Sequence, residues 1–397
     1  MKTNVLFVIP SLGVGGAEKS LVELLNQLNY DDYHVDLLLF RTTGIFTNQI
    51  NKKVNIIKLD EIEELLMFNG KKSIKNLIKR KKYYFVFKKI IISIIFKIFG
   101  KFINDSSLFW SNFHKYFKIN KKEYDVAIAY LQGICAYYTI DKTIAKKKIL
   151  WMHTDYGKYS KNSKHDKNYN GKFQEVVTVS KSACNDFIEH HPKMEKHVHV
   201  IHNIIDTQSI IELSKEPNEI NNDQINIVSV GRLHYAKGFD LVIPALKQLI
   251  NDGFNIKWYV VGEGKERQNL NKIINENNLV DYCYLLGAKV NPYSYINSAD
   301  IYLQSSRYEG YCITLAEART LCKPIVSTDF LGANEQLKHL KTGLIVKCNT
   351  ENIYHGLKKL IEDEVFRNTL IKNLAEESTE NRNEILKVYD LIGKKNN

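Results

Sequence analysis

The chain has 397 residues, of which 44% are hydrophobic and 25% charged, and a formal net charge of +12. This length predicts two domains, and the composition excludes a fibrous or low-complexity chain. Six scattered cysteines, without a C-x-x-C pair or zinc-ligand spacing, favour free thiols in a cytoplasmic protein. We expect neither a signal peptide nor a membrane-spanning helix, because no apolar run is long enough.

Short β-branched runs alternate with helical stretches along the chain. This alternation is typical of parallel sheets with crossover helices, so each half can form a doubly wound α/β domain. We expect strands at 5–10, 35–40, 54–59, 125–131, 149–153 and 176–180, then at 225–231, 256–262, 282–286, 301–304, 325–327 and 344–346.

The polar stretch 216–222 places the domain boundary near 203–222. We expect an N-terminal domain over 1–205 with a basic insertion at about 65–122. A C-terminal domain over 206–380 follows, and then a helix over 381–397 that could cross back to the first domain.

The insertion carries almost all of the net charge. From Lys71 to Lys122 there are fifteen Lys or Arg residues and one acidic residue, Asp105, which gives this stretch a charge of +14. The remainder of the chain is therefore close to neutral. A segment with so high a positive charge indicates an anionic partner.

Within the insertion, residues 74–103 predict a basic amphipathic helix. One side carries Lys89, Ser93, Lys97 and Lys101, and the opposite side carries Ile91, Ile94, Ile95, Ile98, Phe99 and Phe102. Such a helix suits an anionic membrane surface, with lysines at the phosphates and Ile and Phe in the acyl boundary. The alternative is a helix that covers the first sheet, with its lysines in solvent.

The first predicted strand leads into a glycine-rich loop, S-L-G-V-G-G-A-E-K, from Ser11 to Lys19. Glycines between a strand and a helix let backbone N–H groups approach a phosphate or sugar oxygen. The spacing of Gly13, Gly15 and Gly16 is not G-x-G-x-x-G, so a plain tight turn is an equal alternative.

A second loop, S-V-G-R-L-H-Y-A-K-G, runs from Ser229 to Gly238. Arg232 and Lys237 follow the strand and precede the next helix. A planar guanidinium and a compact ammonium suit a diphosphate, and the helix N-terminus adds to their field. The alternative is an ordinary pair of surface cations.

A third loop, S-S-R-Y-E-G-Y-C-I-T-L-A-E-A from Ser305 to Ala318, carries Glu309 and Glu317 around Gly310. We expect Gly310 to start a helix that Glu309 enters, so that the carboxylates lie about two turns apart on one face. Glu317 could then hold a ribose diol. Glu pairs are also common on solvated helices.

In combination, these motifs resemble glycosyltransferase family 4. They are G-G-A-E, V-G-R-L-x-x-x-K-G, V-V-G-E-G and E-G-Y-x-x-x-L-A-E-A, in this order, and the resemblance runs from Val5 to about Asp363 except for residues 60–122. It implies the GT-B fold, in which two Rossmann-like doubly wound domains face an interdomain cleft. It also implies a retaining transferase of the bacterial cell-surface polysaccharide type.

The resemblance also implies roles for individual residues. Arg232 and Lys237 match the pair that binds the donor diphosphate, Glu317 matches the ribose-binding carboxylate, and Glu309 matches the catalytic carboxylate that contacts the donor sugar. The other positions that match donor-binding residues are Gly15, Gly16, Gly262, Ala288, Lys289, Gly310, Tyr311, Cys312, Ile313 and Thr314.

A second catalytic position is His153, which matches the family's strand-end histidine near the reacting sugar. The alternative is an ordinary core histidine. In W-M-H-T-D, Thr154 separates His153 from Asp155, whereas family members often carry His-Asp directly, so no role is assigned to Asp155. Asn203 and Asp206 match the interdomain hinge.

The predicted reaction transfers a hexose or N-acetylhexosamine from a nucleotide sugar, by default a UDP-sugar. The chain lacks D-x-D, so we expect no metal or other cofactor, with cations and helix N-termini neutralising the leaving group. The expected acceptor is a glycan or polyprenyl-diphosphate-linked molecule, since the loop 156–170 is polar, basic and aromatic. We expect a peripheral location on the inner face of the cell membrane.

Two other classes of function stay open. A GT-B-fold nucleotide-sugar epimerase or glycan phosphorylase would share these motifs. A non-enzymatic nucleic-acid binder could use the basic insertion, but its aromatic residues stand among Ile residues and do not form an interleaved stacking platform. We therefore expect no nucleic-acid partner.

Overall fold

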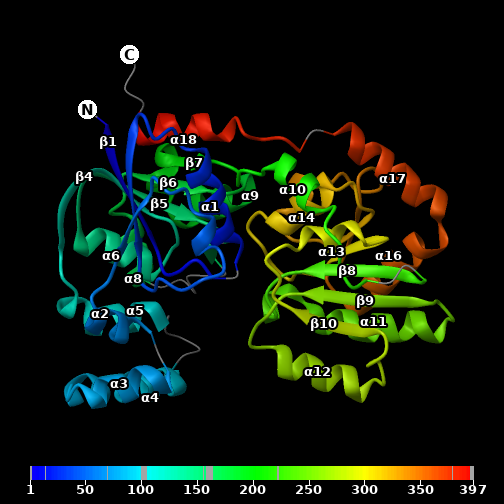
Figure 1. Cartoon of the computed structure of the whole chain (residues 1–397), viewed down its shortest axis with the longest axis horizontal. Coiled ribbons are helices and arrows are strands. Elements are labelled where there is room, and N and C mark those ends of the chain that lie inside the picture. Colours follow the sequence, from blue (N-terminus) through cyan, green and yellow to red (C-terminus); the bar gives the residue numbers. More distant parts are fainter. Residues whose placement is uncertain are drawn as a thin grey trace. The chain divides into compact units, whose positions relative to one another are not determined.

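The computed structural model describes residues 2–13, 15–68, 70–99, 105–154, 156–157, 164–220, 223–377 and 379–393 (Figure 1). It divides into two compact units. The first comprises Met1–Gly13, Ala17–Ile201 and Glu384–Asn397, and the second comprises Val14–Gly16 and His202–Asn383.

The first unit is built on a parallel sheet in the order β3-β2-β1-β4-β5-β6-β7. The strands are β1 (Thr3–Ile9), β2 (Tyr33–Leu39), β3 (Asn55–Lys58), β4 (Asn120–Ala129), β5 (Thr143–Met152), β6 (Glu175–Thr178) and β7 (Val198–Val200). β1 lies between β2 and β4, with Val5 opposite both Val35 and Val126. Its continuous apolar run fits this central position, because helices cover both faces of such a sheet.

The helices of the first unit are α1 (Gly16–Gln27), α2 (Glu61–Met67), α3 (Lys71–Lys79), α4 (Tyr83–Phe99), α5 (Asp105–Phe113), α6 (Ile134–Lys142), α8 (Lys164–Asn170), α9 (Lys181–His190) and α18 (Glu384–Ile392). Short 3₁₀ helices lie at Thr47–Gln49, His114–Tyr116 and Pro192–His197. α2 begins with a capping box, in which Asp60 accepts from the Glu63 N–H and the Glu63 side chain accepts from the Asp60 N–H.

The second unit has a parallel sheet in the order β10-β9-β8-β11-β12-β13. Its strands are β8 (Ile225–Val230), β9 (Ile256–Val261), β10 (Cys283–Gly287), β11 (Ile301–Gln304), β12 (Ile325–Thr328) and β13 (Leu344–Val346). Its helices are α10 (Thr207–Leu213), α11 (Phe239–Asn251), α12 (Arg267–Glu276), α13 (Tyr293–Asn297), α14 (Ile313–Thr320), α15 (Ala333–Gln336), α16 (Thr350–Glu362) and α17 (Glu364–Glu376), with a 3₁₀ helix at Tyr235–Lys237.

The core of the second unit lies on both faces of its sheet. One apolar cluster packs α11 and α16 against β8 and β9 through residues such as Leu246 and Leu357. A second cluster packs α13 and α14 against the other face through Ile296 and Leu315. All four of these side chains are buried, as expected for a doubly wound layer architecture.

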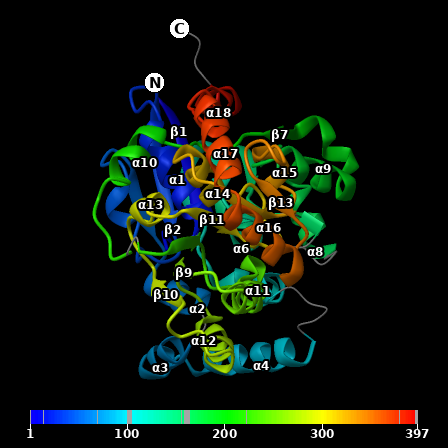
Figure 2. The ribbon, with the colours of Figure 1, turned by 90° about the vertical axis from the view of Figure 1, so that its right-hand side faces the viewer.

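The basic insertion differs from the predicted single helix. Where one helix was expected over 74–103, the described residues form two, α3 and α4, separated by a turn in which Lys81 has a positive φ of 57°. They lie together beyond α2, away from the sheet of the first unit (Figures 1 and 2). Lys101 and Phe102, which the sequence analysis placed on this helix, lie outside the described residues.

Lys89 is the clearest error in the predicted helix faces. Both interpretations of this helix, on a membrane surface or over the first sheet, left its lysine side outside the protein, but Lys89 is 4% exposed. Ile91, Ile94 and Ile98 are exposed, so this side of the helix does not cover the first sheet as in the alternative interpretation. Within the described part of the chain, none of the helices is both long and apolar enough to cross a bilayer.

Candidate functional site

The loops that follow β8 and β9 pack backbone against backbone. A Cβ atom on Gly262 would lie 1.9 Å from the carbonyl oxygen of Gly231, and one on Gly264 would lie 2.2 Å from that of Leu233. The Leu233 N–H donates to the Glu263 carbonyl at 3.0 Å. Glycine is required for this approach, which explains the two glycines of V-V-G-E-G.

Lys237 folds back over Gly231, where a Cβ atom would meet the lysine Cε at 2.8 Å. The Lys237 Nζ lies 2.6 Å from Oε1 of Glu309, and these side chains are 14% and 20% exposed. Burial alone would lower the pKa of Lys237, but the Glu309 carboxylate outweighs burial and the pKa is raised. Lys237 therefore stays protonated at neutral pH, paired with the Glu309 carboxylate.

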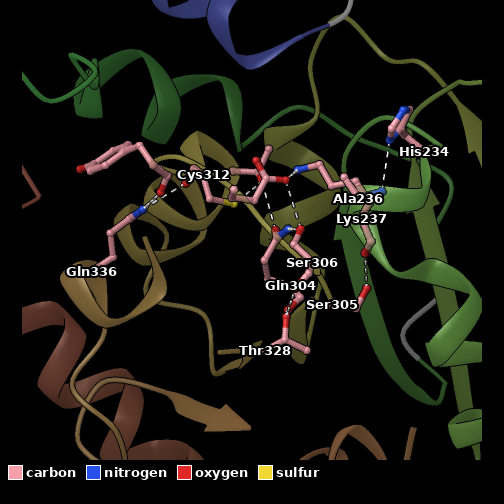
Figure 3. Close-up of polar contacts among 12 residues, drawn as sticks. His234, Ala236, Lys237, Gln304, Ser305, Ser306, Cys312, Thr328 and Gln336 are labelled. Carbon is pink, nitrogen blue, oxygen red and sulfur yellow. Dashed lines mark hydrogen bonds and ion pairs between the residues drawn. The ribbon is translucent and has the colours of Figure 1, made fainter. Parts of the chain in front are cut away.

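Glu309 is oriented by a chain of buried polar side chains, part of which Figure 3 shows. Ser306 Oγ donates to Glu309 Oε1 at 3.1 Å, and Gln304 Nε2 donates to Ser306 Oγ at 2.7 Å. Gln304 Oε1 accepts from Thr314 Oγ1 at 3.2 Å. The carboxylate is thus linked to both the end of β11 and the first turn of α14.

The turn before α14 holds an unusual backbone. Cys312, the N-cap residue, has φ 65° and ψ 78°, a left-handed conformation that is uncommon for a residue with a side chain. A Cβ atom on Gly332 would lie 2.6 Å from the Gly310 carbonyl oxygen. Gln336 Nε2 donates to the carbonyl oxygens of Tyr311 and Cys312 (Figure 3). These contacts hold the turn so that the N–H groups of the helix start are presented in a fixed direction.

The expected placement of the two glutamates was wrong. α14 begins at Ile313, so Glu309 precedes the helix and does not enter it. Glu317 is 1% exposed and lies about one turn into α14. The left-handed Cys312 delays the helix start, which sequence spacing alone did not indicate.

Arg307 joins two segments of this site. Its guanidinium donates to the two oxygens of Asp240 at 2.8 and 2.6 Å, and also to the Tyr235 carbonyl at 2.8 Å. The guanidinium carbon lies 4.0 Å from the Tyr235 ring centroid, and the Arg307 N–H donates to the Ala236 carbonyl at 2.7 Å. Because Lys237 follows Ala236, these contacts fix the turn that carries the lysine.

His153 lies in the first unit, directly after β5. Its ring centroid is 4.9 Å from that of Tyr130, whose hydroxyl is 2.9 Å from Ser20 Oγ. The His153 Nε2 is buried and has no hydrogen-bond partner among the described residues. Burial lowers the pKa of His153 to about 3, so the imidazole is neutral at physiological pH and can exchange one hydrogen bond with a ligand hydroxyl.

The other predicted donor-binding residues have simpler surroundings. Arg232 and Ala288 are exposed, whereas Lys289 pairs with Glu219 at 2.8 Å. Gly16 is the first residue of α1. Asp155 and residues 158–163, within the predicted acceptor loop, lie outside the described residues.

The structure thus brings Lys237, Glu309 and Thr314 together in the second unit. Sequence reasoning missed the supporting residues Gln304 and Arg307. Arg307 stands inside the E-G-Y motif region, but its partner Asp240 is 67 residues away, and nothing in the spacing indicates the contact. Among the residues the structure describes, no cluster of three or more His, Cys, Asp or Glu is arranged to hold a metal ion.

Comparison with known families finds one match, in the second unit. Residues 210–377 match the family described as Glycosyl transferases group 1. The matched residues lie within the second unit. They contain Lys237, Glu309, Gln304 and Arg307, so the local geometry above lies within the matched part of the chain.

Two curated relatives match part of this chain. An uncharacterized glycosyltransferase of Methanocaldococcus jannaschii is 28% identical over 266 residues, which are 59% of this chain and 66% of the relative. The N-acetylgalactosamine-N,N'-diacetylbacillosaminyl-diphospho-undecaprenol 4-alpha-N-acetylgalactosaminyltransferase of Campylobacter jejuni is 31% identical over 194 residues, which are 48% and 52% of the two chains. The chain therefore spans between about half and two thirds of the length of these two relatives.

Similarity to solved structures extends over the whole fold. Anabaena Alr3699/HepE in complex with UDP and glucose has a TM-score of 0.68 at 16% identity, with 98% of each chain covered. At this identity the likeness shows the fold alone. It confirms the predicted GT-B class, with two Rossmann-like units built on parallel sheets.

Proposed function

We propose that the protein is a retaining glycosyltransferase that moves a hexose or N-acetylhexosamine from a nucleoside diphosphate sugar, by default a UDP-sugar. The observation that carries this proposal is the largely buried Lys237–Glu309 pair, 2.6 Å apart, beside the constrained start of α14. Both lie within the residues that match the Glycosyl transferases group 1 family. A fixed cation and helix N–H groups are what a departing diphosphate requires.

In the proposed reaction, the bond between the anomeric carbon and the diphosphate oxygen breaks, and a bond from that carbon to the acceptor oxygen forms on the same face. The acceptor proton passes to the leaving phosphate oxygen. Lys237 and Arg232 stabilise the negative charge that develops there, while Glu309 and neutral His153 hold sugar hydroxyls. Glu317 binds the ribose. These groups act by positioning and charge stabilisation, not as covalent nucleophiles.

The proposed acceptor is a glycan or polyprenyl-diphosphate-linked molecule on the cytoplasmic face of a cell membrane, in the synthesis of a cell-surface polysaccharide. The printed name of the Campylobacter jejuni relative, which acts on an undecaprenol-linked sugar, supports this choice. The basic insertion supports an anionic surface at the acceptor side. We further propose that no metal is required, so chelation with EDTA should leave turnover unchanged.

The test is donor turnover by the full chain with UDP-glucose, UDP-galactose, UDP-GlcNAc, UDP-GalNAc and GDP-mannose, with and without bacterial lipid-linked glycans. We expect nucleotide release and an α-configured product from one donor. Lys237→Ala and Glu309→Gln should lose turnover, and Lys272→Ala, an exposed lysine, should not. An epimerised sugar formed without acceptor, or phosphorolysis of a glycan, would instead identify one of the other GT-B activities.

A further inference from the structure

α4 carries an exposed apolar stripe along one side. We define the α4 stripe as Tyr83, Phe87, Ile90, Ile91, Ile94 and Ile98, each between 38% and 65% exposed. Positions three and four apart fall on one face of a helix, so these side chains form one continuous surface. A contiguous apolar surface of this kind indicates a binding site for an apolar partner.

The opposite side of α4 is fixed to the protein. Ile92 is buried in the core of the first unit with Phe109 and Phe113. Lys89 Nζ donates to the Phe68 carbonyl at 2.8 Å and to Ser73 Oγ at 3.3 Å. Three inward contacts of this kind set the rotation of the helix, so the stripe cannot turn inward without breaking them.

The orientation of α4 about its own axis costs free energy in water, because it buries an amine and exposes apolar side chains. Such an orientation indicates that the exposed side has a partner. Burial lowers the pKa of Lys89 to about 8, so the protein holds a desolvated amine inside while Ile and Phe side chains remain outside. Lys88, the next residue, donates to the Asn112 carbonyl at 2.6 Å. The lysines on the inner side therefore hold the helix in place, and the stripe is the surface left for a partner.

Cations surround the stripe. α3 lies beside α4 (Figures 1 and 2), and the exposed Lys residues of α3, of the connecting turn and of α4 are Lys71, Lys72, Lys75, Lys79, Lys81, Lys82 and Lys97. From Lys71 to Lys122 the only acidic residue is Asp105. The partner must therefore combine an apolar interior with a negatively charged surface.

We propose that the α4 stripe inserts into the boundary between headgroups and acyl chains of an anionic phospholipid bilayer, with α4 lying in the membrane plane. Its 17 residues would extend about 25 Å along the surface, and the lysines of α3 and the turn would contact lipid phosphates. A second copy of this chain is disfavoured, because it would bring two regions of +14 together without carboxylates to neutralise them.

The first experiment is co-sedimentation of the full chain with phosphatidylcholine vesicles, alone or with 30% phosphatidylglycerol. The stripe variant is Phe87→Ser, Ile94→Ser and Ile98→Ser together. Its matched control is Val280→Ser, Val290→Ser and Val365→Ser, at positions 56%, 61% and 78% exposed outside the insertion. Circular dichroism and thermal unfolding check that each variant is folded.

We expect the wild type to bind anionic vesicles preferentially and less at high salt. The stripe variant should bind at least about tenfold more weakly, while the control variant binds like the wild type. Replacing Lys71, Lys72 and Lys75 by Gln should also weaken binding, and replacing Lys193, Lys196 and Lys272 should not.

The depth to which the α4 stripe enters the bilayer is tested with the single substitution Ile94→Trp. Its emission should shift to shorter wavelength with anionic vesicles and be quenched by brominated acyl chains; an emission that stays water-like would overturn the proposal. Equal binding of the stripe variant, absence of wild-type binding, or equal binding to uncharged vesicles would also overturn it. So would lipid-free self-association that the stripe variant abolishes, because the stripe would then be a contact between copies. Neither donor nor acceptor is needed, so these results are independent of the transferase proposal.

Discussion

Lys237 and Glu309 illustrate how two ordinary side chains become a specialised pair. Each is largely buried, so each depends on the other for compensation of its charge. When a diphosphate occupies the site in the proposed reaction, Lys237 gains a second anionic partner without needing to change its protonation. A buried lysine held in its charged form is therefore suited to stabilise a leaving group and unsuited to act as a base.

Because the charges of Lys237 and Glu309 depend on each other, the effects of substituting them on kcat/KM should be strongly coupled. Lys237→Ala should lower kcat/KM by about a hundredfold or more, as expected when a preorganised charge is removed from the transition state. Glu309→Gln should also lower it, and the double variant should lose less than the product of the two losses, because the unpaired charge is then absent. Steady-state kinetics of the four proteins give the coupling.

Lys272→Ala is the matched control, since Lys272 is exposed and lies 3.7 Å from Glu276 on α12. It should retain wild-type kinetics. Strictly multiplicative losses at Lys237 and Glu309 would contradict the idea that the pair acts as a unit.

The lowered pKa of His153 predicts that the stability of the protein depends on pH. Burial lowers its pKa to about 3 in the folded protein, against an ordinary value near 6.5, so below pH 6.5 the unfolded chain binds more protons than the folded one. The stability present at neutral pH is therefore lost as the pH falls from 6.5 towards 3, at about 1.4 kcal/mol per pH unit.

Urea unfolding at pH 7.5 and pH 5.0 measures this effect. Between these two pH values, the free energy of unfolding of the wild type should fall by about 2 kcal/mol more than that of His153→Gln, because Gln does not titrate. The other histidines are common to both proteins and cancel in the comparison. Equal losses in the two proteins would show that His153 is not protected from protonation.

At the scale of elements, the turn that carries Lys237 is held by its own His234, whose Nδ1 accepts from the Ala236 N–H at 3.2 Å, and by the distant Arg307. The bidentate contact with Asp240 and the stacking on Tyr235 both require the planar guanidinium. Arg307 is thus a positioning residue, which acts through the Lys237 turn.

Arg307→Lys should raise KM for the donor about tenfold and leave the fold intact, because a lysine keeps the charge but loses the fork geometry. Asp240→Asn should act in the same direction. Arg367→Lys should leave KM unchanged, because this arginine of α17 contacts carbonyls in the last turn of α16. Unchanged donor KM in Arg307→Lys, measured by initial rates, would rule out the positioning role.

The insertion shows where sequence reasoning reaches its limit. The spacing of Ile and Lys predicted an amphipathic helix, and α4 has that character. Periodicity does not tell which side faces the protein, and only tertiary contacts such as those of Lys89 and Ile92 decide it. The break at Lys81 was also missed, since a positive φ at lysine has no sequence signature.

At the scale of the whole molecule, the chain returns to its first unit at the C-terminus. α18 packs there through Val388, Leu391 and Ile392, which are buried. The Tyr389 ring stacks on Tyr33 with centroids 5.6 Å apart, and its hydroxyl donates to the Gln27 carbonyl at 3.2 Å.

Tyr389→Ala should therefore lower the free energy of unfolding of the first unit by about 3 kcal/mol, through loss of an aromatic contact and a hydrogen bond. Leu386→Ala is the control on the same helix, because Leu386 is 52% exposed. Denaturant unfolding followed by the emission of Trp110 and Trp151 reports on this unit. Equal stability of Tyr389→Ala and wild type would contradict the packing role of α18.

Most of the fold was predictable because its strands are buried on both faces. Each predicted strand corresponds to a strand of the structure, and the two parallel sheets follow from the β-branched runs separated by helices. β7 (Val198–Val200) was missed, since it has three residues of intermediate burial at a sheet edge. The supporting contacts of the site, such as Arg307–Asp240, join residues far apart in sequence and follow only from the folded chain.

The central claim is that the second unit binds a nucleoside diphosphate at Lys237. Isothermal titration calorimetry with UDP tests it without requiring the acceptor. We predict saturable binding to wild type and Lys272→Ala, and at least about tenfold weaker binding to Lys237→Ala. Absence of UDP binding to wild type, or equal affinity in Lys237→Ala, would contradict the claim.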